Sequence, residues 1–389
     1  MQIEEDDQKV LAGEYGETPA KMLEILIALG KVFGAERLIP VRSVQVSGAS
    51  YKTIGEYGLE WLQGLDAHVV VPTIVNPVGM SRNRYQEMGI DSRFVEKQIE
   101  ILHAYEKLGA SLECTCTPYY LTITDYGDHL AWSESSAVSY ANSVIGARTN
   151  REGGPSALAA GIIGKTPEYG LHLLENRAPQ VAFKVDGLNS AEDTSLYGGL
   201  GFLAGKIAGN KIPLFSGIRP QKDSLKALGA AMAATGAVAL YHIEGITPDA
   251  RIFKYTNTEL EEFTISREEI LALYDNSPVE AVAIGCPHCS PDELIKISEI
   301  LLQKKVIIPL FIFVAQGIIE KYSSVVRKIE MSGAKVYGDT CMVVSPMMER
   351  YKSVMVNSGK ALAYIPNMCG ALSRLGTLED CISAACGEK

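Results

Sequence analysis

Two spacings of hydrophobic residues alternate along the chain and mark the elements that it is expected to form. Short apolar runs rich in β-branched residues are typical of strands that are covered on both faces of a parallel sheet. Apolar residues at intervals of three and four are typical of helices with one buried face. The runs that predict strands cover residues 38–46, 67–74, 110–114, 180–185, 212–216, 237–242, 279–284, 307–314 and 334–337.

Helical spacing fills most of the intervals between these strands. In residues 19–33, for example, Met22, Leu26 and Leu29 fall on one face. Strands that alternate with helices predict an α/β fold with doubly wound, mainly parallel sheets. A chain of 389 residues is long for one core, so we expect two units, residues 1–215 and 216–344, with the tail 345–389 packing back on the first. Further helices are predicted after residue 53 and over residues 92–108, 225–235, 267–274, 291–302, 318–331 and 377–386.

Composition narrows the classes of protein and partner that fit this pattern. The formal net charge of -10 argues against general binding to nucleic acid or to an anionic membrane, because both reward an excess of lysine and arginine. No apolar run approaches the roughly 20 residues needed to span a bilayer, and the acidic start MQIEEDD lacks a signal peptide's cationic end. We therefore expect a soluble, cytoplasmic protein whose eight cysteines do not form a disulfide framework.

The turn after the strand predicted over residues 279–284 combines cysteine and histidine with a helix start. It contains Cys286, His288 and Cys289. The next residues, 290–293 (SPDE), match an N-cap serine, a proline at the first helical position and a capping-box glutamate. We expect a helix whose unpaired N–H groups point back at the turn, where open α/β sheets hold their ligands. For His288 two interpretations stay open, an acid or donor in a site and a capping hydrogen-bond partner.

Cysteines occupy the same kind of position after three different strands. Cys116, Cys286 and Cys341 each follow a predicted strand, and the carboxyl ends of parallel strands in one sheet face a shared crevice. Three thiolates without a fourth equivalent ligand predict an iron-sulfur cluster with one iron left open, or a zinc site with a bound water. Cys289 forms a C-x-x-C with Cys286 and is an alternative ligand. The competing interpretation is a set of inert, buried thiols.

Two polar segments are suited to holding anions. The hydroxyl-rich turn over residues 47–53 (SGASYKT) precedes a predicted helix and contains a lysine, which favours phosphate or carboxylate, although such turns also form without a ligand. Residues 127–164 are glycine-rich and polar, and a loop of that length is typically functional or disordered. Its Arg148 and Arg151 offer forked donors for carboxylate or phosphate; alternatively they are solvated surface residues.

Six segments carry distinctive motifs in chain order: 47–62 (SGASYKTIGEYGLEWL), 115–120 (TCTPYY), 134–164 (ESSAVSYANSVIGARTNREGGPSALAAGIIG), 285–290 (GCPHCS), 338–341 (GDTC) and 357–364 (NSGKALAY). Together they resemble the large subunit of aconitase X, in the archaeal type with separate large and small subunits. The resemblance covers essentially the whole chain. It implies aconitase-like three-layer α/β/α subdomains around a shared cleft, and an obligate small, swivelling-domain subunit as the partner in a heterodimer.

The resemblance also implies an activity and a ligand set. Members of this branch dehydrate mevalonate 5-phosphate to trans-anhydromevalonate 5-phosphate, so the expected substrate is a small, anionic, phosphorylated hydroxy acid. The family's cluster ligands correspond to Cys116, Cys286 and Cys341, which implies an iron-sulfur cluster, most simply 4Fe-4S with one open iron. Two alternatives remain, a dehydratase of hydroxyproline or another hydroxy acid, and a non-catalytic metal or redox module.

Within that activity, we assign candidate roles to the polar residues of these motifs. His288, Lys52 and Glu152 are the candidates for catalytic groups. The candidates for substrate binding are Gly48, Ala49, Ser50, Lys52, Thr53, Asn76, Ser135, Ser136, Arg148, Asn150, Arg151 and Lys360.

Overall fold

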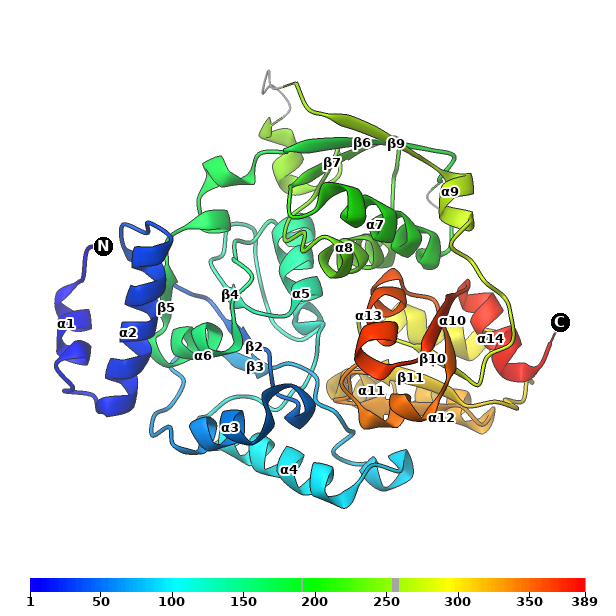
Figure 1. Cartoon of the computed structure of the whole chain (residues 1–389), viewed down its shortest axis with the longest axis horizontal. Helices are drawn as coiled ribbons and strands as arrows, with labels where there is room; N and C mark the ends of the chain where they lie inside the picture. The colour runs from blue at the N-terminus through cyan, green and yellow to red at the C-terminus, as the bar shows by residue number, and fades with distance from the viewer. Residues whose placement is uncertain (190–191, 254–258, 389) are drawn as a thin grey trace.

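The computed structural model describes residues 1–189, 192–253 and 259–388, which form three α/β units (Figure 1). Their strands form four sheets, of which three are parallel and one is an antiparallel pair. The prediction of an α/β fold with mainly parallel sheets is therefore confirmed. Short 3₁₀ turns lie at Tyr85–Met88, Pro118–Tyr120, Gly170–His172, Leu174–Arg177, Pro248–Arg251 and Pro346–Arg350, and Ala141–Ile145 forms a π-helical turn.

The first unit is built on a small parallel sheet in which β2 lies between β3 and β4. Its core is formed by apolar residues of α2, α3, α4 and α6 packed around this sheet. An antiparallel pair, β1 and β5, lies between this sheet and the N-terminal helices. The strands are β1 Leu38–Pro40, β2 Val44–Val46, β3 Thr73–Val75, β4 Ala131–Trp132 and β5 Lys165–Pro167; the helices are α1 Glu5–Leu11, α2 Glu17–Val32, α3 Tyr51–Gln63, α4 Ser92–Lys107, α5 Ser135–Tyr140 and α6 Gly154–Ile163.

The second unit is a parallel sheet of order β8-β7-β6-β9 with helices on one face. Along β6, Phe183 and Val185 are buried against α7 and α8, whereas Lys184 and Asp186 are exposed. This unit therefore has two layers, not the three that were expected. A Cβ on Gly201 of α7 would lie 2.3 Å from the Leu228 carbonyl oxygen of α8, so glycine permits this close packing. The elements are β6 Val181–Asp186, β7 Pro213–Ser216, β8 His242–Ile243, β9 Glu262–Ser266, α7 Thr194–Ala208, α8 Lys222–Thr235 and α9 Arg267–Leu271.

The third unit is a five-stranded parallel sheet of order β12-β11-β10-β13-β14, covered on both faces. Alternate residues of β10 face opposite sides: Val282 packs with α10, α12 and α14, and Ala283 packs with α13. Successive strands are added to one side of β10 as β11 and β12 and then to its other side as β13 and β14, so the strand order reverses between β10 and β13, a switch point of the kind at which α/β sheets bind ligands. The elements are β10 Ala281–Ile284, β11 Leu310–Val314, β12 Lys335–Gly338, β13 Ser353–Val356, β14 Leu372–Leu375, α10 Pro291–Ile300, α11 Gln316–Lys321, α12 Ser323–Met331, α13 Gly359–Cys369 and α14 Leu378–Cys386.

Several local predictions differ from the structure. The strand expected over residues 110–114 is only an isolated bridge from Ser111 to β3. The segment 127–164, expected as a long loop, folds largely into β4, α5, the π-helical turn and α6, because its small residues pack closely in buried helices. Residues 357–360, the start of the last of the six motifs, lie where β13 ends and α13 begins.

The sheets also group the chain differently from the expected two units. A boundary at residue 215 falls inside β7, whose hydrogen-bonded neighbours β6 and β8 lie on either side of it in the chain. The tail from residue 345 contributes β13 and β14 to the sheet of β10, and backbone pairing holds it there rather than on the first unit.

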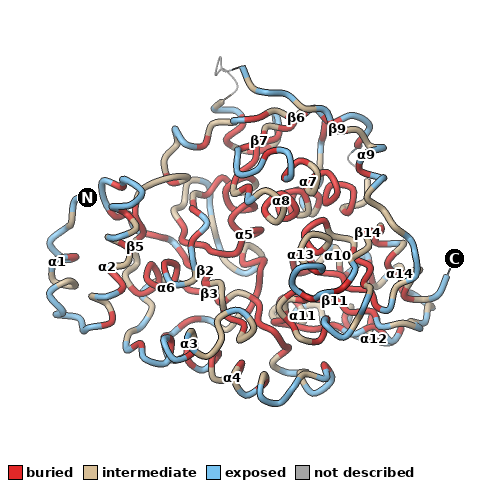
Figure 2. The backbone as a smooth tube through the Cα atoms, viewed as in Figure 1, coloured by how far each residue is buried: buried red, intermediate tan, exposed pale blue. Residues whose placement is uncertain are grey.

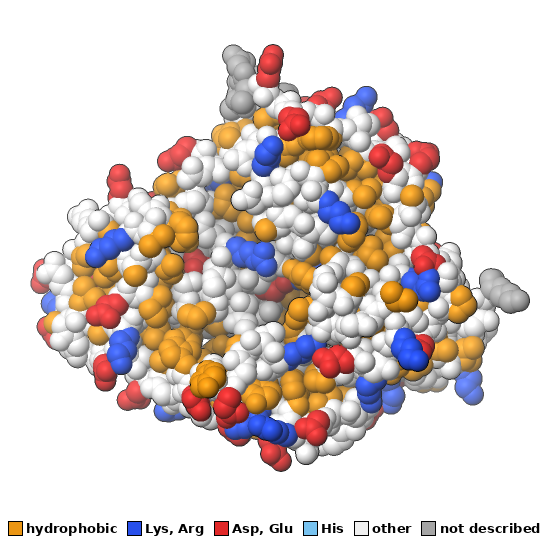
Figure 3. Space-filling model, viewed as in Figure 1, with side chains coloured by type: hydrophobic (Ala, Val, Ile, Leu, Met, Phe, Trp, Pro, Cys, Tyr) orange, Lys and Arg blue, Asp and Glu red, His pale blue; other side chains and the backbone are white. Residues whose placement is uncertain are grey.

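The three units meet at α5, α8 and α13, and Figure 2 shows the buried backbone that runs through this centre. All six residues of α5 are buried. On the face shown in Figure 3, basic and acidic side chains are interspersed. Within the described part of the chain, no helix has the length and apolar character that crossing a membrane requires.

Candidate active site

Cys116, Cys286 and Cys341 line one pocket of about 310 Å³ between the first and third units. Cys116 follows a segment that runs beside β3, where the Thr115 N–H donates to the Val75 carbonyl over 3.1 Å. The other two cysteines follow the carboxyl ends of β10 and β12. The pocket's volume is at the lower end for small-molecule sites, about 300–1,000 Å³. Among the described residues, no group of three or more His, Cys, Asp or Glu is arranged to hold a metal ion.

Burial keeps these three cysteines in the neutral thiol form. It raises the pKa of the Cys116 thiol to about 12, and it also raises the pKa of Cys286 and of Cys341. The positive charge of Lys360 opposes this shift at all three. A buried thiol ionises when a cation compensates its charge, and thiolates are the form in which cysteine binds metal.

A buried ion pair between Lys360 and Glu134 forms another wall of the pocket. Glu134 caps the N-terminus of α5, where it accepts from the Ala137 N–H over 2.8 Å and from the Ser136 hydroxyl. Burial would raise the pKa of Glu134, but Lys360 and these donors hold it below the ordinary value. Burial opposes the charge of Lys360, yet the carboxylate of Glu134 keeps its pKa above the ordinary value. Both groups are therefore charged at neutral pH.

Contacts between units hold the Cys341 turn. Asp339, two residues before the cysteine, is fully buried and accepts from the Arg82 guanidinium at 2.8 and 3.2 Å. The backbone N–H of Cys341 donates to the Val78 carbonyl over 3.0 Å, and the Val78 N–H donates to the Asp339 carbonyl over 2.8 Å. Since Val78 and Arg82 belong to the first unit, the position of Cys341 depends on how the two units pack.

The Cys286 turn is followed by the helix start that the sequence predicts. Ser290 accepts from the Glu293 N–H over 3.1 Å, and the Glu293 carboxylate accepts from the Ser290 N–H over 2.7 Å, a complete capping box. The Ser358 hydroxyl donates to the Cys286 carbonyl, which ties the turn to the start of α13. Cys289 points into the core on the other side of the sheet and does not line the pocket.

The structure brings part of the predicted substrate-binding set to this pocket. Asn76 has a buried side-chain oxygen without a partner, and Ser135 donates to Glu134 over 3.3 Å. Arg151 is exposed and forms no ion pair with other described residues. The predicted binding residues that line the pocket are Thr53, Asn76, Ser135, Arg151 and Lys360; Ser136 lies behind them against Lys360.

Other predicted residues do not line the pocket. Lys52 instead pairs with Glu349 at 2.6 Å and donates to the Met368 carbonyl over 2.6 Å. Glu152 is buried with Ser156 and Thr166, and burial raises its pKa. The remaining predicted residues contact nearby backbone instead. Gly48 and Ala49 form part of the 47–53 turn, and the Ser50 hydroxyl donates to the Val344 carbonyl. Arg148 donates to the His172 carbonyl, and the Asn150 amide donates to the Tyr169 carbonyl and accepts from the Leu171 N–H.

The most important lining residue without a predicted role is Glu134. It stands in a polar motif, but its partner Lys360 lies 226 positions away in the chain, and no local spacing connects them. Tyr364 and Met368 of α13 also line the pocket, because they follow Lys360 at intervals of four residues and so share its face of the helix. The other lining residues without a predicted role are Ser47, Pro77, Ser133, Gly285, Met342, Val343 and Val344.

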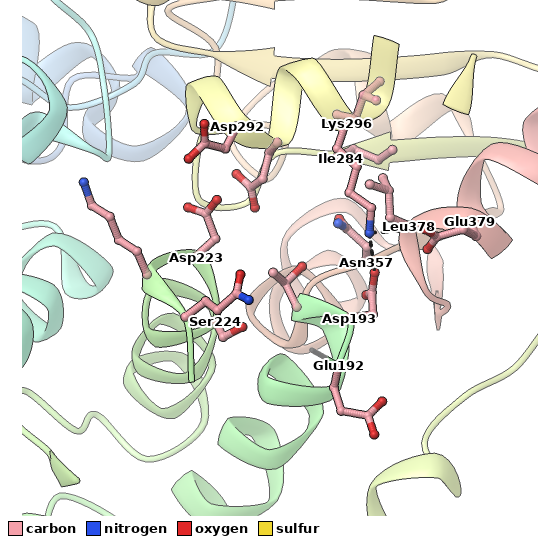
Figure 4. A pocket seen from close by; sticks show the side chains of 15 residues that line it. Glu192, Asp193, Asp223, Ser224, Ile284, Asp292, Lys296, Asn357, Leu378 and Glu379 are labelled. Carbon is pink, nitrogen blue, oxygen red and sulfur yellow. Dashed lines mark ion pairs between the residues drawn. The ribbon is translucent and has the colours of Figure 1, made fainter. Parts of the chain in front are cut away.

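A second cavity, of about 400 Å³, lies where α7, α8, α10 and α14 begin (Figure 4). Acidic side chains from these helix starts surround Lys296, which pairs with Asp193 at 3.6 Å and with Glu379 at 3.2 Å. Carboxylates at the starts of helices stabilise the helix dipoles. The charged lining of this cavity is therefore accounted for by helix capping and by ion pairs between the second and third units.

Comparisons with known proteins agree with this arrangement. Family models described as the first, second and third domains of aconitase X match residues 1–175, 179–275 and 279–387. These ranges coincide with the three units around the three main sheets.

The similar curated proteins include the phosphomevalonate dehydratase large subunits of Methanosarcina mazei and Methanocaldococcus jannaschii. The first is 52% identical over 100% of this chain and 98% of its own length, and the second is 44% identical over 98% and 99%. A cis-3-hydroxy-L-proline dehydratase of Pseudomonas aeruginosa is 30% identical, and the match covers 98% of this chain and 69% of that protein. The crystal structure of Thermococcus kodakaraensis aconitase X (holo-form) superposes with a TM-score of 0.91 at 43% identity, over 99% of this chain and 100% of that one.

Proposed function

This chain belongs to the aconitase X family, and we propose that it is the large subunit of a hydro-lyase that converts mevalonate 5-phosphate to trans-anhydromevalonate 5-phosphate. Full-length relatives of 43–52% identity bear the name phosphomevalonate dehydratase large subunit. The hydroxyproline dehydratases are more distant, and this chain spans only 69% of their length. The observation that carries the chemistry is the meeting of three buried cysteines in one pocket.

The donor set of the pocket fits an iron-sulfur cluster. Thiolates are the usual ligands of such clusters, and each thiolate binds a different iron, so the three sulfurs need not surround one point. A backbone N–H at Cys116 Sγ and the charge of Lys360 both favour the thiolate form. We propose that Cys116, Cys286 and Cys341 hold a 4Fe-4S cluster with one open iron. When bound, such a cluster supplies a Lewis acid that makes a substrate hydroxyl a better leaving group.

The remaining side chains of the pocket are suited to an anionic hydroxy acid. Arg151, exposed and without an ion-pair partner in the described chain, offers a forked donor for the substrate's phosphate. Asn76 offers a buried oxygen without a donor, which matches a substrate hydroxyl. Lys360 carries a fixed positive charge that favours a carboxylate and the negative charge that develops beside it when the neighbouring proton leaves.

The proton-abstracting group is proposed to come from the partner subunit. Glu134 is fully engaged with Lys360 and the start of α5, and both ring nitrogens of His288 are hydrogen-bonded. Neither of these two lining groups is free to accept a proton from the substrate. A separate small subunit that closes over the pocket supplies the missing base and excludes water, which accounts for the heterodimer.

Anaerobic purification of this chain together with a small subunit tests the proposal. We expect iron and labile sulfide in the complex, and dehydration of mevalonate 5-phosphate but not of hydroxyproline. Tightly bound zinc without sulfide would refute the cluster, and activity on the imino acid alone would refute the substrate.

A further inference from the structure

His288 is a buried side chain that joins the segments carrying the three cysteines. It is 1% exposed and belongs to the same turn as Cys286. Its Nε2 lies 2.8 Å from the Thr340 carbonyl oxygen, immediately before Cys341, and its Nδ1 lies 3.1 Å from the Thr115 hydroxyl, immediately before Cys116. Its backbone N–H donates to Cys116 Sγ over 3.2 Å. One residue thus contacts the immediate surroundings of every proposed ligand.

The partners of His288 fix its tautomer and occupy both ring nitrogens. A carbonyl oxygen only accepts, so the proton is on Nε2, which donates to Thr340. Nδ1 of the neutral ring then accepts from the Thr115 hydroxyl, whose oxygen in turn accepts from the Thr117 N–H over 3.0 Å. Neither a proton nor a lone pair of the ring remains available to a substrate.

The backbone of His288 is held from the second unit. Its carbonyl accepts from Lys226 Nζ over 3.3 Å, and the buried Lys226 is paired with Glu293 of the capping box. His288 therefore contacts all three units: Thr115 in the first, Lys226 in the second and Thr340 in the third. This matters because Cys116 lies on the first unit, whereas Cys286 and Cys341 lie on the third. The spacing of the three sulfurs depends on contacts that span the units.

We propose that His288 is a positioning residue that sets the spacing between Cys116 and the other two cysteines, and so determines how tightly the chain holds its cluster, rather than an acid of the reaction. The part that concerns the cluster rests on the proposed function. Hydrogen-bond partners behind metal ligands typically change metal affinity about 10–100-fold when they are replaced. The expected defect of a His288 variant is therefore in cluster retention, with the chemistry of loaded enzyme preserved.

Cluster retention is measured on the full chain after anaerobic reconstitution, as iron and sulfide per chain and as the rate at which a chelator bleaches the visible absorbance. His288→Leu should lose its cluster roughly tenfold faster than the unmodified chain. Thr115→Val, a nearly isosteric change that removes only the hydroxyl bonded to Nδ1, should shift the rate in the same direction by less. The matched control is His242→Leu, because His242 is also fully buried and bonded through Nε2 to a carbonyl, 2.7 Å away at Arg177, but lies in the second unit.

Glutamine at position 288 separates positioning from proton transfer, since an amide donates a hydrogen bond but does not exchange its proton with a substrate. For cluster-loaded complex, we expect His288→Gln to keep the pH profile of kcat/KM and most of kcat. Loss of kcat and of one limb of that profile at full cluster content would overturn the inference and make His288 an acid.

Equal bleaching rates for His288→Leu, Thr115→Val and the unmodified chain would also overturn the inference. If the unmodified chain itself takes up no iron and sulfide, the proposed function fails and the role of His288 in holding a cluster fails with it. The unmodified arm distinguishes that result from a failure of the inference alone.

Discussion

Replacing Lys360 with methionine tests the buried ion pair that forms one wall of the pocket. The side chains of Lys360 and Glu134 are 7% and 8% exposed, so the substitution leaves a carboxylate buried without its cation. Removing one member of such a pair costs about 3–5 kcal/mol. The hydrogen bonds that Glu134 accepts from Ser136 and the Ala137 N–H remain, so we expect a value near 3 kcal/mol at neutral pH.

The pH dependence of this loss follows from the two forms of Glu134. In the unmodified chain its pKa lies below the ordinary 4.5, so its contribution to stability is present above pH 4.5 and declines as the pH falls through the folded value. In Lys360→Met the carboxylate is desolvated and protonates at higher pH. The difference in stability between the two proteins should therefore be largest near pH 7 and shrink as the pH falls.

The assay is urea unfolding of the metal-free chain at several pH values, with the double variant Lys360→Met/Glu134→Gln. The double variant should recover most of the loss at pH 7, because no charge remains buried. Lys97→Met is the matched control: its partner Glu56 is 42% exposed, so solvent screens the pair and the expected cost is much smaller than that of Lys360→Met. The reasoning is refuted if Lys360→Met costs no more than this control, or if the double variant is less stable than the single one.

Three further predictions concern binding, the cluster and acid stability. Arg151→Gln should raise KM for mevalonate 5-phosphate by about tenfold or more with a smaller effect on kcat, since a charged hydrogen bond is worth about 1.5–3 kcal/mol, whereas Arg148→Gln should leave KM unchanged. Cys286→Ser should abolish iron and sulfide uptake and Cys289→Ser should retain it; equal losses would contradict the assignment. Burial lowers the pKa of His172 from 6.5 to about 3, so its neutral form stabilises the fold above pH 6.5 and that contribution declines below it. The thermal midpoint of His172→Asn should therefore fall less than that of the unmodified chain between pH 6.5 and 4.

The regular part of the fold was predictable because local patterns determine it. The helix start after Cys289, with its capping box, and the alternation of strands and helices in the third unit both match the sequence. Hydrophobic spacing did not reveal that residue 215 lies inside the second unit, because this follows from strand pairing, which joins β7 to neighbours on both sides of that point. It also could not identify α5 and α6, whose small residues are buried on nearly every side and lack an amphipathic period.

For the site, the sequence pointed to residues at strand ends but not to side-chain directions. Cys286 and Cys341 follow the carboxyl ends of β10 and β12 in one sheet, where such ends share a crevice. Cys116 follows a segment beside β3, in a different sheet, and reaches the same pocket because the first unit packs against the third. Lys52 and Arg151 stand in equally polar motifs, yet Lys52 is satisfied by Glu349 and only Arg151 reaches the pocket. Such differences arise from contacts between distant segments, which a local motif does not contain.

The most direct test of the whole account is turnover by the reconstituted heterodimer. This chain and a small subunit, purified together without oxygen and loaded with iron and sulfide, should release water from mevalonate 5-phosphate, and Cys116→Ser in the same complex should abolish both cluster and turnover. Full turnover by the Cys116→Ser complex, or turnover of hydroxyproline with none of mevalonate 5-phosphate, would contradict it.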